Sequence, residues 1–166
     1  RNNLQKPVAL MLNKAQERLT FLKPGLHLLV YDAARPLSVQ QHMWNALDSI
    51  PVKERVKFVS SPRGKSLHNL GCAVDLTICD AKGIPLDMGA GFDDIRLIAY
   101  PMHEAKFLAD GSLTMQHVEN RKLLRRVMRY AGFTGIPTEW WHFNAYSKKE
   151  ALERFQVIET EESIDQ

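Results

Sequence analysis

Residues 66–79 have the sequence SLHNLGCAVDLTIC, and this stretch decides how the chain is organised. Its second half, residues 73–79, is an apolar run interrupted by Asp75, which is typical of a buried strand. The half before it is polar and contains Gly71, whose conformational freedom lets the chain fold back towards the strand. Turn-forming residues follow, so we predict a hairpin over residues 80–86.

The rest of the chain contains further helical and strand patterns. Apolar residues recur at three- and four-residue intervals in four segments, and Ser38 with Gln41 forms a capping box at the start of the second. Residues 87–116 contain three glycines and no sustained period, which predicts a long loop with at most one short helix. Helices are expected over 7–22, 38–50, 118–131 and 147–155, and strands over 26–31, 56–60, 73–79 and 140–145.

The composition and these elements restrict the class of protein. The 166-residue chain is 45% hydrophobic and 25% charged, as is usual for a globular protein. We predict one domain, residues 1–166, with an α+β fold in which helices pack on a small, mostly antiparallel sheet. A net charge of +3 does not indicate a nucleic-acid partner, and no run approaches the ~20 apolar residues that cross a bilayer, so no membrane partner is expected.

The two cysteines and the first residue carry less information. Cys72 and Cys79 lie seven positions apart at one predicted strand, so their side chains point to opposite faces. We expect neither a disulfide nor a thiolate metal site, and treat both as small buried residues. The chain begins at Arg1 rather than Met, which is compatible with removal of a signal peptide or another leader and leaves the compartment open.

His68 and Asp75 are the first candidates for chemistry. An ionised aspartate inside an apolar strand is costly to bury unless a cation or strong hydrogen bonds compensate. Asp75 alone could equally form a salt bridge or a capped loop end, and His68 alone could be a hydrogen-bonded histidine. With Gly71 between them, the chain can turn so that both side chains face one point.

A second candidate group is Glu139-Trp140-Trp141-His142, at the head of an apolar strand. Positions three apart in a regular strand face opposite sides. Convergence of Glu139 with His142 therefore requires a bulge or a strong twist at this place. The alternative is an ordinary strand with a polar start and a packed histidine.

Taken together, these residues indicate a catalytic zinc site at the sheet. His68, Asp75 and His142 would supply three ligands and leave a fourth tetrahedral position for water, whose pKa the metal lowers to ~7. Glu139 is then the natural proton acceptor. Arg35, just after a buried strand, could polarise a substrate carbonyl, or it could form an ion pair with a carboxylate such as Asp32.

Four segments carry a resemblance to a known family. They resemble, in order and spacing, the D-alanyl-D-alanine dipeptidases of the VanX type, within the wider group of zinc peptidases that act on bacterial cell-wall peptides. The match runs from about residue 31 to 143, and the first and third segments look specific to the dipeptidases. The segments are Tyr31-Asp32-Ala33-Ala34-Arg35-Pro36, Ser66-x-His68-x-x-Gly71-x-Ala73-Val74-Asp75, Met88-Gly89-Ala90-Gly91-Phe92-Asp93 and Glu139-Trp140-Trp141-His142.

This resemblance implies roles for the candidate residues. It implies a bacterial enzyme, periplasmic or cytoplasmic, that hydrolyses the small molecule D-Ala-D-Ala with one Zn²⁺ ion. Ser66 and Asp93 would bind substrate, with Asp93 near the free ammonium group and Asp94 as its adjacent alternative. The implied zinc ligands are His68, Asp75 and His142, the general base and acid is Glu139, and the carbonyl polariser is Arg35.

The chain also departs from the family pattern. No tyrosine precedes Tyr31, whereas family members carry one near the substrate, and the segment 98–116 is longer than expected. Three other functions therefore remain: a cell-wall D,D- or L,D-carboxypeptidase or endopeptidase, a non-catalytic module that binds peptidoglycan fragments, and a structural metal domain. The last is disfavoured because closed zinc sites use four ligands, usually with cysteines.

Overall fold

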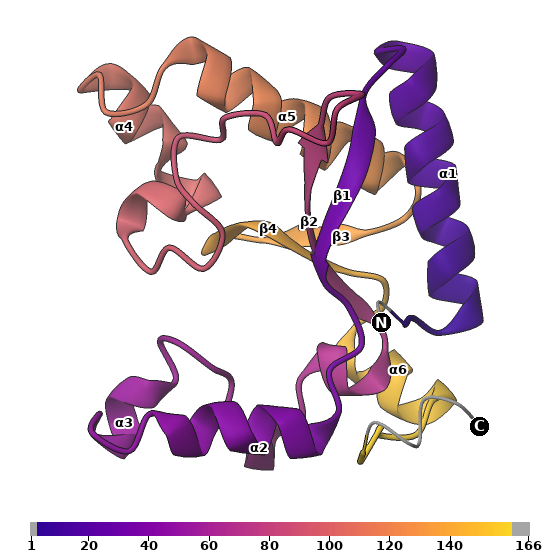
Figure 1. Cartoon of the computed structure of the whole chain (residues 1–166), viewed down its shortest axis with the longest axis vertical. Coiled ribbons are helices and arrows are strands. Elements are labelled where there is room, and N and C mark those ends of the chain that lie inside the picture. The colour runs from indigo at the N-terminus through magenta and orange to yellow at the C-terminus, as the bar shows by residue number, and fades with distance from the viewer. Residues whose placement is uncertain (1–2, 161–166) are drawn as a thin grey trace.

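The centre of the structure is an antiparallel sheet with the strand order β1-β2-β4-β3 (Figure 1). The computed structural model describes residues 3–160. Helices pack on this sheet, so the α+β fold expected from the sequence is confirmed. The strands are β1 (His27–Asp32), β2 (Ala73–Cys79), β3 (Thr134–Ile136) and β4 (Glu139–Asn144).

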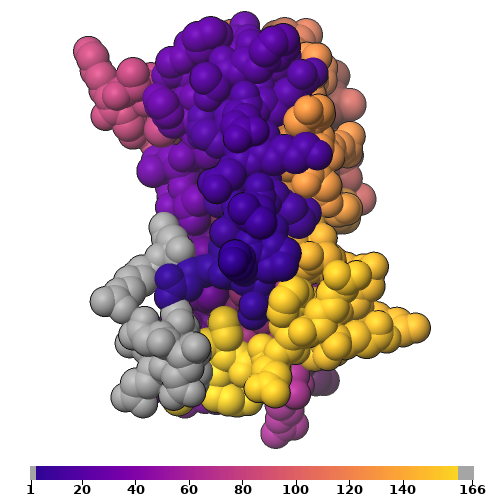
Figure 2. Space-filling model, turned by 90° about the vertical axis from the view of Figure 1, so that its right-hand side faces the viewer, coloured from indigo at the N-terminus to yellow at the C-terminus, as the bar shows by residue number. Residues whose placement is uncertain are grey.

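Helices α1 and α5 pack against each other on one face of the sheet. In Figure 2 the indigo segment that includes α1 lies over the upper and central part of the surface, with yellow C-terminal residues below it. Among the described residues, no helix is both long and apolar enough to cross a membrane. The helices are α1 (Lys6–Leu22), α2 (Leu37–Ala46), α3 (Val52–Arg55), α4 (Glu104–Ala109), α5 (Met115–Tyr130) and α6 (Lys148–Arg154).

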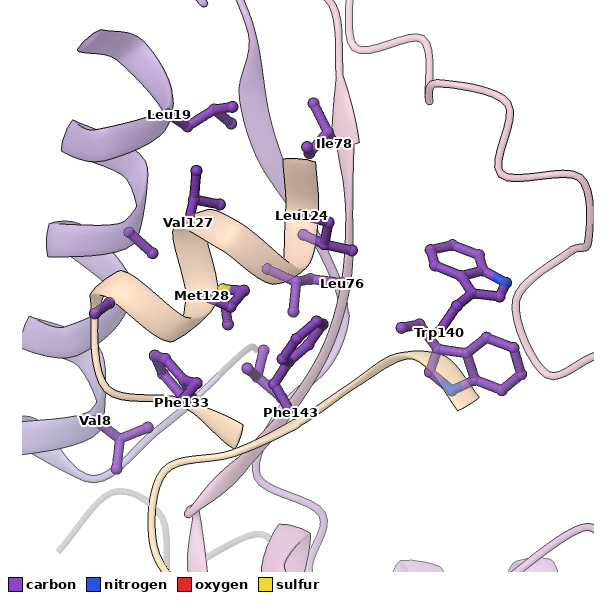
Figure 3. Packing of buried hydrophobic residues seen from close by; sticks show 14 of the residues in the cluster. Val8, Leu19, Leu76, Ile78, Leu124, Val127, Met128, Phe133, Trp140 and Phe143 are labelled. Carbon is purple, nitrogen blue, oxygen red and sulfur yellow. The ribbon is translucent and has the colours of Figure 1, made fainter. Parts of the chain in front are cut away.

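The main hydrophobic core lies between this helical layer and β2. All seven residues of β2 are buried, as its apolar sequence predicts. Figure 3 shows Leu19 of α1 and Val127 of α5 on one side of β2, and Trp140 on the other side. Trp140 donates from Nε1 to the carbonyl oxygen of Ala90 at 3.1 Å. The segment after residue 86 therefore packs against the second face of the sheet.

Two arms flank this second face (Figure 1). One carries α2 and α3, and the other is the long segment of residues 87–109, which includes α4. Buried Gln40 ties the first arm to the rest, because its Nε2 donates to Ser60 O at 3.0 Å and its Oε1 accepts from Asn69 Nδ2 at 2.9 Å. The sequence predicts a long loop over residues 87–116 with at most one short helix. The structure instead has two 3₁₀ helices, Leu97–Ala99 and Pro101–His103, before α4 in this segment.

The start of α2 differs from the sequence prediction. The helix begins at Leu37 after Pro36, and no side chain caps it. The predicted capping box of Ser38 is wrong because the C-terminal segment satisfies the free amides instead. Leu37 N donates to Ile158 O at 2.8 Å, and Ser38 N donates to Glu159 O at 3.0 Å.

Two strand predictions also need correction. Residues 56–60 form turns after α3, not a strand, and the side chains of Val56 and Phe58 are 57% and 45% exposed. The strand β3 was not expected from the sequence, because three residues that include Gly135 carry no usable period. Helix α2 ends at Ala46, four residues early, and α5 begins at Met115, three residues early.

Candidate functional site

A short 3₁₀ helix, Leu67–Leu70, presents His68 to the second face of the sheet. The Ser66 hydroxyl oxygen accepts from His68 N at 3.3 Å, and Asn69 Oδ1 accepts from Ser66 N at 2.7 Å. Gly71 ends this turn at φ 63°, in the left-handed region that glycine adopts without strain. The local sequence therefore turns the chain so that His68 faces the adjoining strand β2.

Asp75 and His142 are cross-strand neighbours in the pairing of β2 with β4. Such pairs place their side chains on one face of the sheet, about 4.5–5.5 Å apart at Cβ. The pairing of β3 with β4 shifts register after Gly135, so that Ile136 lies opposite Glu139. The strand is thus irregular at the place where convergence of Glu139 with His142 requires a bulge or a strong twist.

The atoms of His68, Asp75 and His142 meet at one point. His68 Nε2 lies 3.3 Å from His142 Nδ1, and the two oxygens of Asp75 lie 3.4 Å from His68 Nε2 and 2.9 Å from His142 Nδ1. Zinc ligands at 2.0–2.1 Å in a tetrahedral arrangement are separated from one another by about 3.3 Å. The three side chains therefore fit a zinc ion with little rearrangement.

Hydrogen bonds on the far side of each imidazole support this fit. His68 Nδ1 donates to Ala33 O at 2.6 Å, and His142 Nε2 donates to Asn144 Oδ1 at 2.7 Å. Because both partners are acceptors, they place the ring hydrogens on those nitrogens. The lone pairs of His68 Nε2 and His142 Nδ1 are then directed at the same place, which is the arrangement that a metal requires.

The electrostatics of the three groups agree with a cation site. Burial alone would raise the pKa of Asp75, but His68 and His142 outweigh it and hold this pKa well below its usual range. Burial lowers the pKa of His142, and the Asp75 carboxylate more than reverses this, so the pKa is raised. Asp75, only 4% exposed, is thus an anion inside the protein with two imidazoles around it.

Glu139 lies at the edge of this group. Its Oε2 is 3.8 Å from His142 Nδ1, and its side chain is 39% exposed to the cavity. Burial raises the pKa of Glu139, His142 opposes the shift and Asp75 adds to it. A carboxylate with a raised pKa is a better proton acceptor near neutral pH.

Arg35 lies three residues after the end of β1. It lines the cavity into which His68, Asp75 and His142 also face. Its Nε donates to Asp32 Oδ2 at 2.9 Å, and its Nη2 forms an ion pair with the same oxygen. Its main chain is also fixed, because Arg35 N donates to His68 O at 2.9 Å and its carbonyl accepts from Asn69 Nδ2 at 2.8 Å. The ion pair with Asp32 therefore exists, and it orients the guanidinium at the wall of the cavity.

Asp93 and Asp94 have different surroundings in the structure. Asp93 has φ 60° and lines the cavity that contains the three converging side chains. Burial, followed by the charge of Asp75, raises the pKa of Asp93, while Arg35 opposes the shift. Asp94 instead accepts from Arg96 Nη2 at 2.6 Å, and this arginine lowers its pKa. Asp93 is the carboxylate that faces the site.

The cavity itself has a volume of about 390 Å³. It lies on the second face of the sheet, between the two arms. Ser66 lines it together with Arg35, Asp93 and Glu139, so the structure brings all the residues singled out in the sequence to one place.

Comparison with known proteins gives the family. The model of the family described as D-ala-D-ala dipeptidase, Peptidase_M15, matches residues 3–159. The chain is 40% identical over 119 residues to a D-alanyl-D-alanine dipeptidase of Escherichia coli, which covers 72% of this chain and 55% of that protein. The chain belongs to the D-Ala-D-Ala dipeptidase family.

Two further dipeptidases support this membership. The chain is 29% identical over 168 residues to one from Synechocystis sp., covering 85% of this chain and 68% of that protein. It is 30% identical over 151 residues to one from Enterococcus faecalis, covering 83% and 70%. The chain spans about half the length of the Escherichia coli relative and about two thirds of the other two.

One solved structure gives a weaker likeness. It is a variant of the vancomycin-resistance D,D-pentapeptidase VanY in complex with Zn(II), matched with a TM-score of 0.47 and 15% identity. The match covers 92% of this chain and 78% of that chain.

Several residues around the dipeptidase-family site were not predicted. Asn144 could have been found, because positions two apart on a strand share a face and His142 is one of them. The carbonyl of Ala33 leaves no signal in the sequence. Lys65 and Lys148 also line the cavity, and Lys65 has φ 51°, a conformation that is strained for a residue other than glycine.

Proposed function

We propose that this chain is a zinc-dependent dipeptidase that hydrolyses D-Ala-D-Ala to two D-alanine molecules. The observation that carries the proposal is the convergence of His68, Asp75 and His142 within 4.8 Å, with Glu139 beside them. Membership of the dipeptidase family supports this reaction and this substrate. The catalytic unit is one domain, and its substrate is a free small molecule.

The three converging side chains would hold one Zn²⁺ ion. Two nitrogens and a carboxylate are ligands of catalytic zinc sites, which keep a fourth position open. When bound, the ion supplies a Lewis acid that acidifies water and polarises a carbonyl oxygen. His68 and His142 would bind it through Nε2 and Nδ1, since the other nitrogen of each ring donates to an acceptor on its far side.

Glu139 is the general base and acid of the proposed reaction. Its carboxylate takes a proton from the water that attacks the scissile carbonyl carbon. It then returns this proton to the amine nitrogen as the C–N bond breaks, so Glu139 ends in its starting form. Proton transfer by a positioned side chain contributes typically 10²–10⁴-fold to the rate.

Arg35, Asp93 and Ser66 are the proposed positioning and binding groups. Arg35, oriented by Asp32, donates to the carbonyl oxygen as negative charge develops on it. Asp93 binds the ammonium group of the dipeptide. The Ser66 oxygen already accepts from His68 N, so its own hydrogen is free to be donated to the substrate carboxylate.

Metal analysis with a panel of dipeptides tests the proposal. We expect about one zinc per chain, and hydrolysis of D-Ala-D-Ala but not of L-Ala-L-Ala. A pentapeptide that ends in D-Ala-D-Ala separates this function from that of a cell-wall carboxypeptidase, because it lacks a free ammonium group next to the scissile bond. Preferential hydrolysis of the pentapeptide would contradict the dipeptidase assignment.

Replacement of Glu139 tests its role directly. Glu139→Ala should lower kcat for D-Ala-D-Ala by at least about 10²-fold while zinc remains bound, because the carboxylate moves protons and does not hold the metal. His68→Ala should lose both zinc and activity. A Glu139→Ala protein that hydrolyses D-Ala-D-Ala at the normal rate would show that the proposed mechanism is wrong.

A further inference from the structure

A second cavity of about 410 Å³ adjoins the one that holds the proposed zinc site. The two share part of their lining, so they are neighbours between the arms. Cavities for drug-sized ligands measure roughly 300–1,000 Å³, so the first cavity alone has room for a small dipeptide. The shared residues are Val56, Lys57, Phe58, Asp93, Glu139 and Trp141.

The charged residues of the second cavity are already paired with neighbours. Lys57 forms an ion pair with Glu54, and Asp94 accepts three hydrogen bonds from the guanidinium of Arg96. These pairs lie within single turns of the chain. They leave the second cavity without a free charge of its own, beyond the two carboxylates at its border with the first.

Apolar side chains lie on both walls of the second cavity, among the polar side chains of Lys57, Asp94 and Thr138. Val56 and Phe58 come from the arm of α3, and Ile95 comes from the opposite arm. These side chains are 57%, 45% and 48% exposed, so none of them belongs to the core. Trp141 closes the inner end and is held by an edge-to-face contact with Phe92 at 5.6 Å. A substrate group placed here would cover exposed apolar area on two walls, which favours binding.

The position of Asp93 decides which part of the substrate reaches this space. Asp93 lines both cavities, at their border, and it is the proposed partner of the substrate ammonium group. The second cavity therefore lies beside the amino-terminal residue of a bound dipeptide. A peptide extended at that end would present an uncharged amide to Asp93, so a side chain is the better occupant.

We propose that the second cavity is a specificity site for an apolar side chain on the amino-terminal residue of the substrate. The preferred substrates are then D,D-dipeptides in which a residue such as D-leucine precedes D-alanine, with D-Ala-D-Ala as the smallest member of the class. This inference rests on the proposed dipeptidase function and on the binding of the ammonium group by Asp93.

Kinetics on matched dipeptides test the inference in the zinc-loaded protein. We expect kcat/KM for D-Leu-D-Ala to exceed that for D-Ala-D-Ala by about tenfold, since one added methylene in an apolar pocket is worth 10-fold or more. D-Ala-D-Leu, which has the same composition with the side chain at the other end, should show no such gain. N-acetyl-D-Leu-D-Ala should be a poor substrate because it lacks the ammonium group.

Variants of the cavity walls connect this preference to the structure. Ile95→Ala and Phe58→Ala should each lower the ratio of kcat/KM for D-Leu-D-Ala to that for D-Ala-D-Ala about fivefold or more. Val52→Ala is the matched control, since Val52 is 62% exposed on α3 and lies outside the lining of both cavities. It should leave the ratio unchanged.

Three results would overturn the inference. One is a kcat/KM for D-Leu-D-Ala at or below that for D-Ala-D-Ala, and another is an unchanged ratio in both wall variants. The third is equal hydrolysis of the acetylated and the free dipeptide. In the first two cases hydrolysis of D-Ala-D-Ala would still support the proposed function, whereas the third result would also overturn the role of Asp93. The absence of any dipeptide hydrolysis would refute both proposals.

Discussion

At the scale of single residues, the site depends on groups that never contact the substrate. The ring of His68 is oriented by a main-chain oxygen, Ala33 O, which no substitution removes. The ring of His142 is oriented by a side chain, Asn144 Oδ1, which a substitution can remove. This difference makes Asn144 the residue at which ring orientation can be tested without changing a ligand.

We predict that Asn144→Leu weakens zinc binding by about 10–100-fold, the usual effect of losing a partner that orients a metal-binding histidine. Competition with a chelator of known affinity measures the change. Asn144→Asp keeps an acceptor at the same place, so this variant should bind zinc much more tightly than the Leu variant. Equal affinity of the wild type and Asn144→Leu would show that Asn144 does not orient His142.

At the scale of elements, the helix α5 holds the arm that carries Asp93. Buried Arg121 donates from Nε to Met88 O at 2.7 Å and from Nη2 to Ile98 O at 3.0 Å. Its Nη1 lies 3.5 Å from Glu104 Oε1, and Arg125 also binds Glu104 with two hydrogen bonds. The side chain of Arg121 thus fixes residues 88–98, which contain little regular structure, at both ends.

Replacement of Arg121 should therefore destabilise the whole chain. Arg121→Met leaves the carbonyls of Met88 and Ile98 without their donor, while Glu104 keeps its two hydrogen bonds from Arg125. An unsatisfied buried polar group costs about 1–3 kcal/mol, so the two carbonyls together cost about 2–6 kcal/mol. We expect a fall in Tm of roughly 4–24 °C in thermal unfolding, at about 2–4 °C per kcal/mol for a chain of this size. Arg126→Met, at an exposed position of the same helix, is the control and should change Tm by less than about 2 °C. A similar Tm for both variants would disprove this role.

The elements also show what the sequence could and could not predict. The helices α1 and α6 and the strand β2 follow from periodicity and end signals, because most of their apolar residues face the core; Leu10, Phe21 and Leu152 are the exposed exceptions. Residues 56–60 were predicted as a strand and contain the apolar residues Val56, Phe58 and Val59, yet only Val59 is buried. Apolar residues that line a cavity have the same sequence signal as apolar residues of a core.

The pairing of the strands could not be predicted from a local sequence pattern either. Asp75 and His142 face each other only because β4 lies beside β2 in the sheet order, and nothing within either segment specifies that order. The sequence predicted which residues converge. It also indicated that β4 must be irregular near Glu139 if Glu139 and His142 are to meet. The partners of these residues, such as Asn144 and Ala33, depend on the assembled sheet.

At the scale of the whole molecule, the candidate metal ligands join distant parts of the chain. His68 and His142 are 74 residues apart, and they come from a 3₁₀ helix before β2 and from β4. An ion bound between them would connect two strands and the turn that precedes them. Because such a site exists only in the folded protein, binding and folding are coupled.

Zinc should therefore stabilise the protein measurably. At free zinc about 100-fold above Kd, a ligand that binds only the folded state contributes about 2.7 kcal/mol, which corresponds to roughly 5–11 °C in Tm. Calorimetric melting with and without a chelator measures this shift. His142→Ala lacks one of the three ligands and should show a much smaller zinc-dependent shift from its own metal-free Tm. An equal shift in the variant and the wild type would place the ion elsewhere on the chain, since the stabilisation would not require the side chain of His142.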